Sequence, residues 1–154
     1  MTDDDIQKFF TEIERILVPN GHVMFWVDKF ILLNSLKQLT GHTDLQLIDM
    51  LTWNKGRMGM GYRTRRKSEY LVIFQKPPIK AKDVWKRRNI PDVWDEKITD
   101  RTHPHSKPIE LQKALIEAVT LENDIVVDPT AGSYSTLVAT KATGRNFLGC
   151  DLLG

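Results

Sequence analysis

The sequence has one cysteine and no long apolar run, and these two absences narrow the possible classes of protein. A single Cys150 among 154 residues excludes an internal disulfide framework and a cysteine-rich zinc module. The longest apolar runs, such as Val23–Val27, are far shorter than the roughly 20 residues that cross a bilayer. The first five residues lack the basic and apolar regions of a signal peptide. We therefore expect a cytoplasmic protein without a membrane partner.

Acidic residues are scarce in one stretch, although the net charge of the whole chain is only +2. Between Lys55 and Arg88 there are twelve Lys or Arg residues and two acids, and the rest of the chain carries ten basic and eighteen acidic residues. A basic stretch of this density fits a contact surface for a polyanion. It fits equally a solvated loop with long Lys and Arg stems, so charge alone leaves both interpretations open.

Hydrophobic periodicity and turn residues predict alternating strands and helices along the chain. Amphipathic spacing predicts a helix over residues 3–17, and Phe30–Leu39 resembles a second helix with Gly41 as its C′ glycine. The expected strands are 22–28, 45–53, 69–75, 124–128 and 146–151, and the other helices are 109–121 and 135–143. Residues 76–101 show no period and are expected to form a long connection. This alternation indicates an α/β fold with a mostly parallel sheet.

The most informative segment is the strand 124–128 together with the turn of small residues that follows it. The turn is Asp128-Pro129-Thr130-Ala131-Gly132-Ser133, and a second strand about twenty residues further ends at Cys150-Asp151. Small residues let the backbone approach a ligand, and an acid after the second strand accepts hydrogen bonds from ribose hydroxyls. The turn lacks both G-x-G-x-x-G and the P-loop pattern, so a ligand with a ribose and no phosphates fits better. An ordinary turn beside a chance acid is the alternative.

Together with Gly144–Asp151, this turn resembles the cofactor motif of S-adenosylmethionine-dependent DNA amino-methyltransferases, which methylate the exocyclic amine of adenine or cytosine. The order of the motifs resembles the β group of that family. The segment His103-Pro104-His105-Ser106-Lys107-Pro108 resembles the family's His-Pro-x-x-Lys-Pro segment beside the methionine end of the cofactor. Weaker matches are Leu51–Lys55, Met58–Arg63, Ser68–Tyr70 and Ile16–His22. The resemblance covers essentially the whole chain and implies a single methyltransferase-like domain, 1–154, with a Rossmann-like sheet.

The resemblance also implies a cofactor site and a DNA surface. S-adenosylmethionine would be held by Asp128, Pro129, Thr130, Ala131, Gly132, Ser133, Asp151, His103, Ser106 and Lys107. Residues 76–102 stand where the family places target recognition, here as a basic loop. The implied partner is double-stranded DNA, bound by Arg63, Arg65, Arg66, Lys80, Lys82, Trp85, Lys86, Arg87 and Arg88. The Lys and Arg cations would neutralise phosphates, and Trp85 would stack on a base or wedge between bases.

Some residues near this site are given other roles or depart from the family pattern. Thr130 stands where the family usually has an aromatic residue, and Tyr134 where it has a second glycine, so Tyr134 is expected to crowd the cofactor turn. His103 and His105 lack the Cys or carboxylate partners of a metal site, and no metal is expected. Cys150 is expected to be a small buried strand residue, because no His and Asn pattern surrounds it.

The family's catalytic motif has no counterpart in these 154 residues. That motif is an acidic, Asn or Ser residue followed by Pro-Pro and an aromatic, whereas the only pair here, Pro77-Pro78, precedes Ile79. In the resemblance its strand lies between strands 22–28 and 124–128, so we expect an incomplete sheet without the central catalytic strand. A rearranged sheet, a second chain supplying the strand, and a remnant of an enzyme are the three possibilities.

The function implied by the resemblance is that of a DNA methyltransferase homologue, which transfers a methyl group from S-adenosylmethionine to an exocyclic base amine. The catalytic residues are unassigned, because the motif that supplies them is not found, and the lone chain is expected to be inactive. Two alternatives stay open. One is a non-catalytic DNA-binding module, and the other is one subunit of a split methyltransferase.

Overall fold

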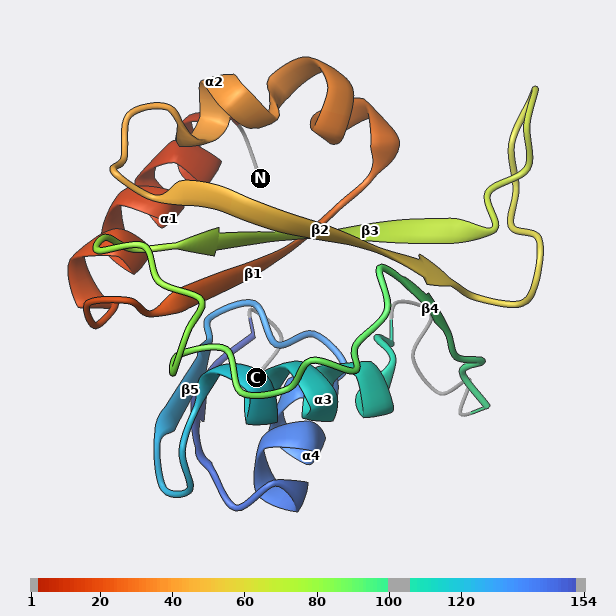
Figure 1. Cartoon of the computed structure of the whole chain (residues 1–154). Coiled ribbons are helices and arrows are strands. Elements are labelled where there is room, and N and C mark those ends of the chain that lie inside the picture. Colours follow the sequence, from red (N-terminus) through yellow and green to blue (C-terminus); the bar gives the residue numbers. More distant parts are fainter. Residues whose placement is uncertain (1–2, 100–105, 152–154) are drawn as a thin grey trace.

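The computed structural model describes residues 3–99 and 106–151, and it arranges them in layers (Figure 1). The middle layer is a four-stranded sheet in the order β1-β3-β2-β4, built from β1 (His22–Val27), β2 (Gln46–Asn54), β3 (Ser68–Gln75) and β4 (Val93–Asp95). A smaller sheet pairs β5 (Ile125–Asp128) with β6 (Asn146–Gly149). The helices are α1 (Asp3–Ile16), the π-helix η1 (Ile31–Ser35), α2 (Leu36–Thr40), α3 (Ile109–Val119) and α4 (Ser135–Ala142).

Strand direction follows the predicted mostly parallel sheet only in part, because one strand of the larger sheet is reversed. β1 and β2 both pair antiparallel with β3, and β4 pairs parallel with β2, so that β1, β2 and β4 share one direction. β5 and β6 are parallel. The predicted α/β class is confirmed, with two parallel pairings (β2–β4 and β5–β6) and two longer antiparallel ones, because β3 runs against both of its neighbours. The carboxyl ends of β1 and β2 therefore meet the start of β3 at one edge of the sheet.

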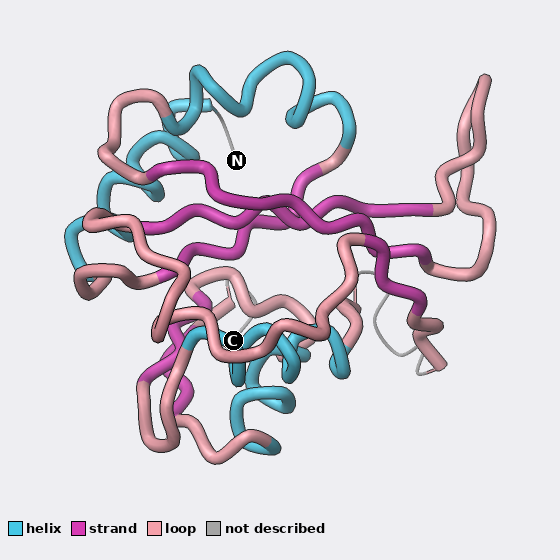
Figure 2. Tube along the Cα trace, in the orientation of Figure 1, coloured by secondary structure: helices cyan, strands magenta, loops and turns pink. Residues whose placement is uncertain are grey.

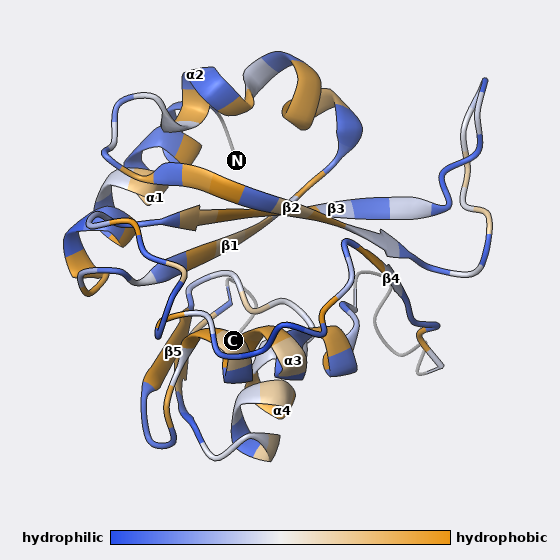
Figure 3. Ribbon diagram, in the orientation of Figure 1, coloured by the Kyte–Doolittle hydropathy of each residue, from blue (hydrophilic) through white to orange (hydrophobic). Residues whose placement is uncertain are grey.

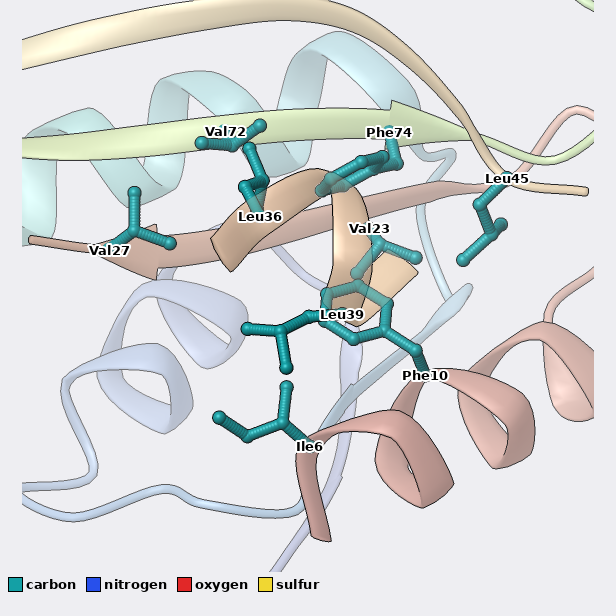
Figure 4. Close-up of a cluster of buried hydrophobic side chains, with 9 residues drawn as sticks. All are labelled: Ile6, Phe10, Val23, Val27, Leu36, Leu39, Leu45, Val72 and Phe74. Atoms are coloured by element: carbon teal, nitrogen blue, oxygen red, sulfur yellow. The ribbon is translucent and has the colours of Figure 1, made fainter. Parts of the chain in front are cut away.

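One face of the larger sheet is closed by α1, η1 and α2 (Figure 2). The side chains of this upper core lie between α1, α2 and the strands (Figure 4), and they are Ile6, Phe10, Val23, Val27, Leu36, Leu39, Leu45, Val72 and Phe74. Phe10 is fully buried and lies edge-on to the rings of Phe25 and Phe74, at centroid distances of 5.0 and 5.6 Å. Each such side chain contributes about 1.5–3 kcal/mol by leaving water.

The opposite face is closed by α3 and by the segment that precedes it. Leu111 and Leu115 of α3 pack against Leu51, Trp53 and Ile73 of the sheet in a lower core. Trp85, Ile90, Trp94 and Ile98 pack against that core from residues 76–98. The predicted long connection is therefore a packed segment, and it contains the short strand β4, which the sequence reading missed because three residues carry no period.

The helix predicted over Phe30–Leu39 is divided in the structure. η1 and α2 together cover the range, and Gly41 ends α2 with φ of −68°, so the predicted left-handed C′ glycine is wrong. A close approach accounts for the glycine instead, because a Cβ there would lie 2.6 Å from the carbonyl oxygen of Lys37. The remaining predicted helices and strands are confirmed, with ends that shift by a residue or two.

The strands form two separate sheets, as expected if a strand between them is lacking. Among residues 3–99 and 106–151, β1 pairs only with β3 and β5 pairs only with β6. α4 packs on α3 and β6, so one side of the smaller sheet is covered. The other side carries exposed apolar side chains from β5 and β6, namely Ile125, Val127 and Leu148.

Candidate functional site

The turn between β5 and α4 folds back over the carboxyl ends of β5 and β6. The Ala131 N–H donates to the carbonyl of Cys150 at 3.0 Å, and the Thr130 N–H donates to Oδ1 of Asp128 at 3.1 Å. Ala131 is buried, whereas Gly132 is exposed with φ of +52°, and a Cβ there would meet no heavy atom closer than 3.9 Å. The turn therefore offers open backbone beside Gly132, where a ligand can approach closely.

Asp151 reaches this same turn from the end of β6. Its Oδ2 accepts a hydrogen bond from the Gly132 N–H at 3.0 Å, which joins the acid after the second strand to the turn after the first. Gly149 permits the two strand ends to lie this close, because a Cβ on it would clash with the Asp128 carbonyl oxygen. The structure thus brings together the six turn residues and Asp151, as the sequence predicted. Their assignment as cofactor ligands stays a prediction.

Tyr134 precedes α4 in a left-handed backbone conformation, with φ of 56° and ψ of 25°. Residues with a Cβ adopt this region at a cost of about 1–2 kcal/mol, and glycine does so freely. The family's glycine is expected at this position, and the backbone conformation here is one that glycine would favour. The Tyr134 ring lies edge-on to Phe147 of β6 at a centroid distance of 6.4 Å, so it packs toward the smaller sheet.

A charged pocket of about 410 Å³ lies where β1 and β2 end and β3 begins. Its lining holds six basic and two acidic residues, and it comprises Trp26, Val27, Asp28, Lys29, Lys55, Thr64, Arg65, Arg66, Lys67, Ser68, Glu69, Tyr70 and Lys107. Lys107, which was predicted beside the cofactor, stands in this pocket with its Nζ 5.1 Å from the centre of the Trp26 ring. Ser106, its neighbour, is half-buried.

Glu69 organises the positive charges of this pocket. Its carboxylate accepts from Lys107 Nζ at 2.6 Å and from Lys55 Nζ at 3.1 Å. Burial disfavours the ionised Glu69, but the hydrogen bond and charge of Lys107, followed by those of Lys55, outweigh burial and hold its pKa below the ordinary value. The ionised Glu69 therefore links Lys107 of the His-Pro-x-x-Lys-Pro segment to Lys55 at the end of β2.

The basic stretch from Lys55 to Arg88 is split by β3 into two surfaces. Residues 55–67 form a hairpin at the start of β3, and residues 76–88 leave its other end. Eight strand residues at about 3.3 Å each put about 25 Å between the two ends. The hairpin carries Arg63, Arg65 and Arg66, which are exposed, and Lys80, Lys82 and Arg88 are exposed at the far end. The structure does not join the predicted DNA-contacting residues into one patch.

Three predicted DNA-contacting residues take part in packing instead. Trp85 lies against the lower core, its Nε1 donates to the Arg87 carbonyl at 2.6 Å, and its ring meets His22 edge-on. Lys86 donates from its backbone N–H to Ala118 and from Nζ to Thr120, both at the end of α3. Arg87 pairs with Glu117 at 2.6 Å. The half-buried Trp85 ring packs against the lower core, so it would have to leave that core to stack on a base.

Other predicted residues fall outside the site or outside the described part of the chain. His103, Pro104 and His105 lie among residues 100–105, which the structure does not describe. Cys150 was expected to be buried and is exposed, with its Sγ 3.6 Å from the Pro129 carbonyl. It lies just after β6, beyond the packed part of the strand, which accounts for the error. In residues 3–99 and 106–151, no group of three or more His, Cys, Asp or Glu is arranged to hold a metal ion.

Sequence reasoning missed two residues that organise these sites. The sequence pattern places Glu69 in a strand and gives it no role. A signal was present, because Glu69 is the one acid before Asp83 in the basic stretch and could be expected to pair with the surrounding cations. Glu96, at the end of β4, accepts hydrogen bonds from the backbone N–H groups of Glu110 and Leu111, each at 3.0 Å. It thereby caps α3 from a distance of fourteen residues, which no local pattern reveals.

Comparison with known proteins gives consistent relatives. The profile of the DNA methylase family, N6_N4_Mtase, matches residues 2–153. The chain is 55% identical over 154 residues to the Type II methyltransferase M.HhaII of Haemophilus parahaemolyticus, a match that covers 99% of this chain and 68% of M.HhaII.

The solved structures agree on the fold. The crystal structure of the M1.HpyAVI–SAM complex matches with a TM-score of 0.79 at 21% identity, covering 98% of this chain and 78% of that one. The PvuII DNA methyltransferase, which is cytosine-N4-specific, matches with a TM-score of 0.82 at 16% identity, covering 97% of this chain and 65% of that one. The curated relatives matched over nearly the whole of this chain are longer, and it spans 59–68% of their length.

No helix in the described ranges has both the length and the apolar character needed to pass through a membrane.

Proposed function

The chain belongs to the DNA methylase family, and from this premise we propose that it binds S-adenosylmethionine at the turn 128–133 and serves methyl transfer to an exocyclic amine of adenine or cytosine in DNA. The observation that carries the proposal is a hydrogen bond between the segments that follow β5 and β6. The Asp151 carboxylate accepts it from the Gly132 N–H, beside open backbone. We further propose that residues 1–154 act as one methyltransferase-like domain of the cytoplasm.

The residues of the turn fit the nucleoside end of this cofactor. Gly132 leaves its backbone open where a ligand would lie, because a Cβ on it would project into open space, and the small Ala131 is buried beneath the turn. Asp151 engages the turn through Oδ2, and an acid that follows the second strand of such a unit accepts ribose hydroxyls in nucleoside-binding folds. When bound, the cofactor supplies a methyl group on a positively charged sulfur. The chain's own part is to hold that group and to shield it from water.

Lys107 and Ser106 are proposed to bind the methionine end of the cofactor. Their backbone follows the undescribed segment with His103, and Glu69 fixes Lys107 through its 2.6 Å ion pair. DNA is proposed to lie over the pocket edge, where the excess of basic over acidic side chains suits a phosphate backbone. The target base must leave the stack to be methylated, and unstacking is offset by contacts in a pocket.

A calorimetric titration of the chain with S-adenosylmethionine tests the cofactor site. Asp151→Ala should weaken binding by about 1.5–3 kcal/mol, because a charge-assisted hydrogen bond is lost. Asp4→Ala is the matched control, since Asp4 is an exposed acid in the first turn of α1. Equal affinities of parent and Asp151→Ala would remove Asp151 from the site.

A second candidate is that this chain acts as one part of a two-part methyltransferase. Its support is the smaller sheet, where Ile125 is 65% and Leu148 is 62% exposed in strands whose apolar run is typical of burial on both faces. β1 and β5 also have unpaired edges among the described residues. An extended strand that carries an acidic, Asn or Ser residue followed by Pro-Pro and an aromatic would pair there and supply the acceptors that orient the target amine.

A tritiated-methyl assay on mixed duplex DNA separates the two candidates. We expect no transfer above a heat-killed control from the 154 residues alone, and transfer once a polypeptide with the Pro-Pro-aromatic strand is added. Incorporation by the chain alone that is lost in Asp128→Ala would make it self-sufficient and would refute the two-part proposal. Binding of DNA and cofactor without transfer in either mixture would favour a non-catalytic DNA-binding module.

A further inference from the structure

The hairpin of residues 55–67 carries an exposed apolar tip in a basic frame. We propose that this tip is a wedge that enters a base-pair step of duplex DNA, with Tyr62 as the inserting ring and Met60 beside it. The inference rests on the proposed function, because it takes DNA as the partner. It concerns residues that neither the cofactor turn nor the pocket lining uses.

The hairpin is held in a defined, narrow shape. The Lys55 N–H donates to the Lys67 carbonyl at 2.9 Å, and the Gly59 N–H donates to the Arg66 carbonyl at 2.6 Å. The two arms lie close at Gly61, because a Cβ there would clash with the Thr64 carbonyl oxygen. The hairpin projects from the end of the sheet as a narrow ribbon (Figure 1). Residues 55–67 contain no strand, so the hairpin is a narrow irregular loop, and apolar wedges of the kind proposed enter base steps from the minor groove.

The apolar side chains of the tip stand in solvent. Tyr62 is 110% and Met60 is 90% exposed, which makes them the two most exposed large apolar side chains in the described part of the chain. Met58, on the same hairpin, is 62% exposed. An aromatic ring and two thioether side chains that project together from a narrow loop are typical of a contact site, because burying each of them against a partner is favourable in free energy.

The charge of the hairpin selects a polyanion as the partner. All six charged residues of 55–67 are basic: Lys55, Arg57, Arg63, Arg65, Arg66 and Lys67. Lys55 is used by Glu69 at the hairpin base, and Arg66 lies 3.9 Å from Asp28, whereas Arg57 and Arg63 flank the tip. Proteins that kink DNA place apolar side chains between base steps while Arg and Lys neutralise the phosphates on either side. The hairpin has the same arrangement, with the apolar Met60 and Tyr62 at its tip between Arg57 and Arg63.

The pocket stands at the base of the same hairpin. Thr64, Arg65 and Lys67 line it, so a duplex gripped by the hairpin passes over the pocket mouth. Wedging at the tip would kink and partly unstack the duplex beside that mouth, which assists the unstacking that base methylation requires. The wedge is therefore a device for presenting DNA, separate from the residues that hold the cofactor.

Unwinding of closed circular plasmid tests the wedge without knowledge of a recognition sequence. Insertion between base pairs unwinds the duplex, so plasmid relaxed by a topoisomerase in the presence of the chain should show a shifted linking number. We expect Tyr62→Ala to abolish the shift and to weaken duplex binding about tenfold, with an unchanged salt slope. Tyr62→Phe should keep both. Leu33→Ala is the matched control, because Leu33 is a 78% exposed apolar side chain on η1.

The outcomes separate this inference from the proposed function. Arg63→Gln should lower the slope of log affinity against log salt by about 0.9 and leave a linking-number shift at saturating protein. Unchanged affinity and linking number in Tyr62→Ala, with DNA still bound, would overturn the wedge and leave the DNA surface standing. A parent chain that binds phosphatidylserine vesicles and no duplex would overturn both.

Discussion

The two sheets of the molecule differ in how completely they are covered. The larger sheet has helices α1, η1 and α2 on one face and α3 with residues 76–98 on the other, so its central strand β3 is buried from Leu71 to Gln75. Among the described residues, α4 covers one side of the smaller sheet, and β5 is largely hydrophobic (Figure 3) yet exposes Ile125 and Val127. Equally apolar strands thus end in different environments, because burial depends on which other elements reach them.

This difference shows where the stability of the chain resides. The larger sheet has both faces covered by its two cores, whereas the smaller sheet carries the proposed cofactor turn and an apolar face open to solvent. Among the described residues, β1 of the larger sheet and β5 of the smaller sheet both have an unpaired edge where a further strand would pair. The exposed apolar face of the smaller sheet is the part that a covering partner would complete.

The largest expected difference is between the loss of stability on truncating a core residue of the larger sheet and that on truncating an exposed residue of the smaller sheet. Phe10→Ala should lower the free energy of unfolding by about 3–5 kcal/mol, because it leaves a cavity in the upper core. Ile125→Ala should change it by about 0.5 kcal/mol or less, since the side chain is already in water. Urea unfolding with a common m-value measures both. Similar losses would show that the β5 face is covered in solution.

A second prediction concerns Glu69 at the edge of the larger sheet. Glu69→Gln should cost about 1.5–3 kcal/mol, because Lys107 and Lys55 lose a half-buried carboxylate. Because the pKa of Glu69 is lower in the folded protein, the ionised carboxylate stabilises the fold at pH values above the ordinary pKa of a glutamate. This stabilisation is lost as the pH falls through the pKa of Glu69 in the folded state. The parent should therefore lose stability more steeply below about pH 4.5 than Glu69→Gln. Glu110→Gln, which breaks a largely exposed pair, should behave as the parent.

A third prediction concerns the link between β4 and α3. Glu96→Ala should lower the free energy of unfolding by about 1–2 kcal/mol, because two N–H groups in the first turn of α3 lose their acceptor. Amide exchange at Leu111 should accelerate in the same variant. Unaltered exchange there would show that water replaces the carboxylate at no cost.

The smallest expected effect lies in the smaller sheet. Tyr134→Gly removes left-handed strain but loosens the unfolded chain and loses the Phe147 contact, so the net change should be about 0.5 kcal/mol or less. Tyr134→Ala keeps the strain and loses the contact, and should be about 1 kcal/mol less stable than the glycine variant. S-adenosylmethionine affinity of Tyr134→Gly should equal or exceed that of the parent. A marked loss of affinity would make Tyr134 a ligand residue.

Local patterns in the sequence were enough to predict most elements and the ligand turn. The i, i+3, i+4 spacing located α1, because Ile6 and Phe10 must share one helical face to be buried. Small residues between β5 and α4 marked the turn, since only they allow the backbone of Ala131 and Gly132 to close over the strand ends. Both features depend on contacts between residues a few positions apart, so the local order of residues in the sequence is enough to predict them.

Tertiary structure alone decided the features that join distant segments. The basic stretch reads as one block, but β3 places its halves at opposite ends of a strand, and Trp85 packs against the lower core. Glu69 and Lys107, thirty-eight residues apart, meet because the reversed strand β3 starts beside the end of β1. Glu96 caps α3 for the same kind of reason. Contacts of this range depend on strand order and direction, which hydrophobic periodicity does not encode, because the same alternation fits either direction and any neighbour.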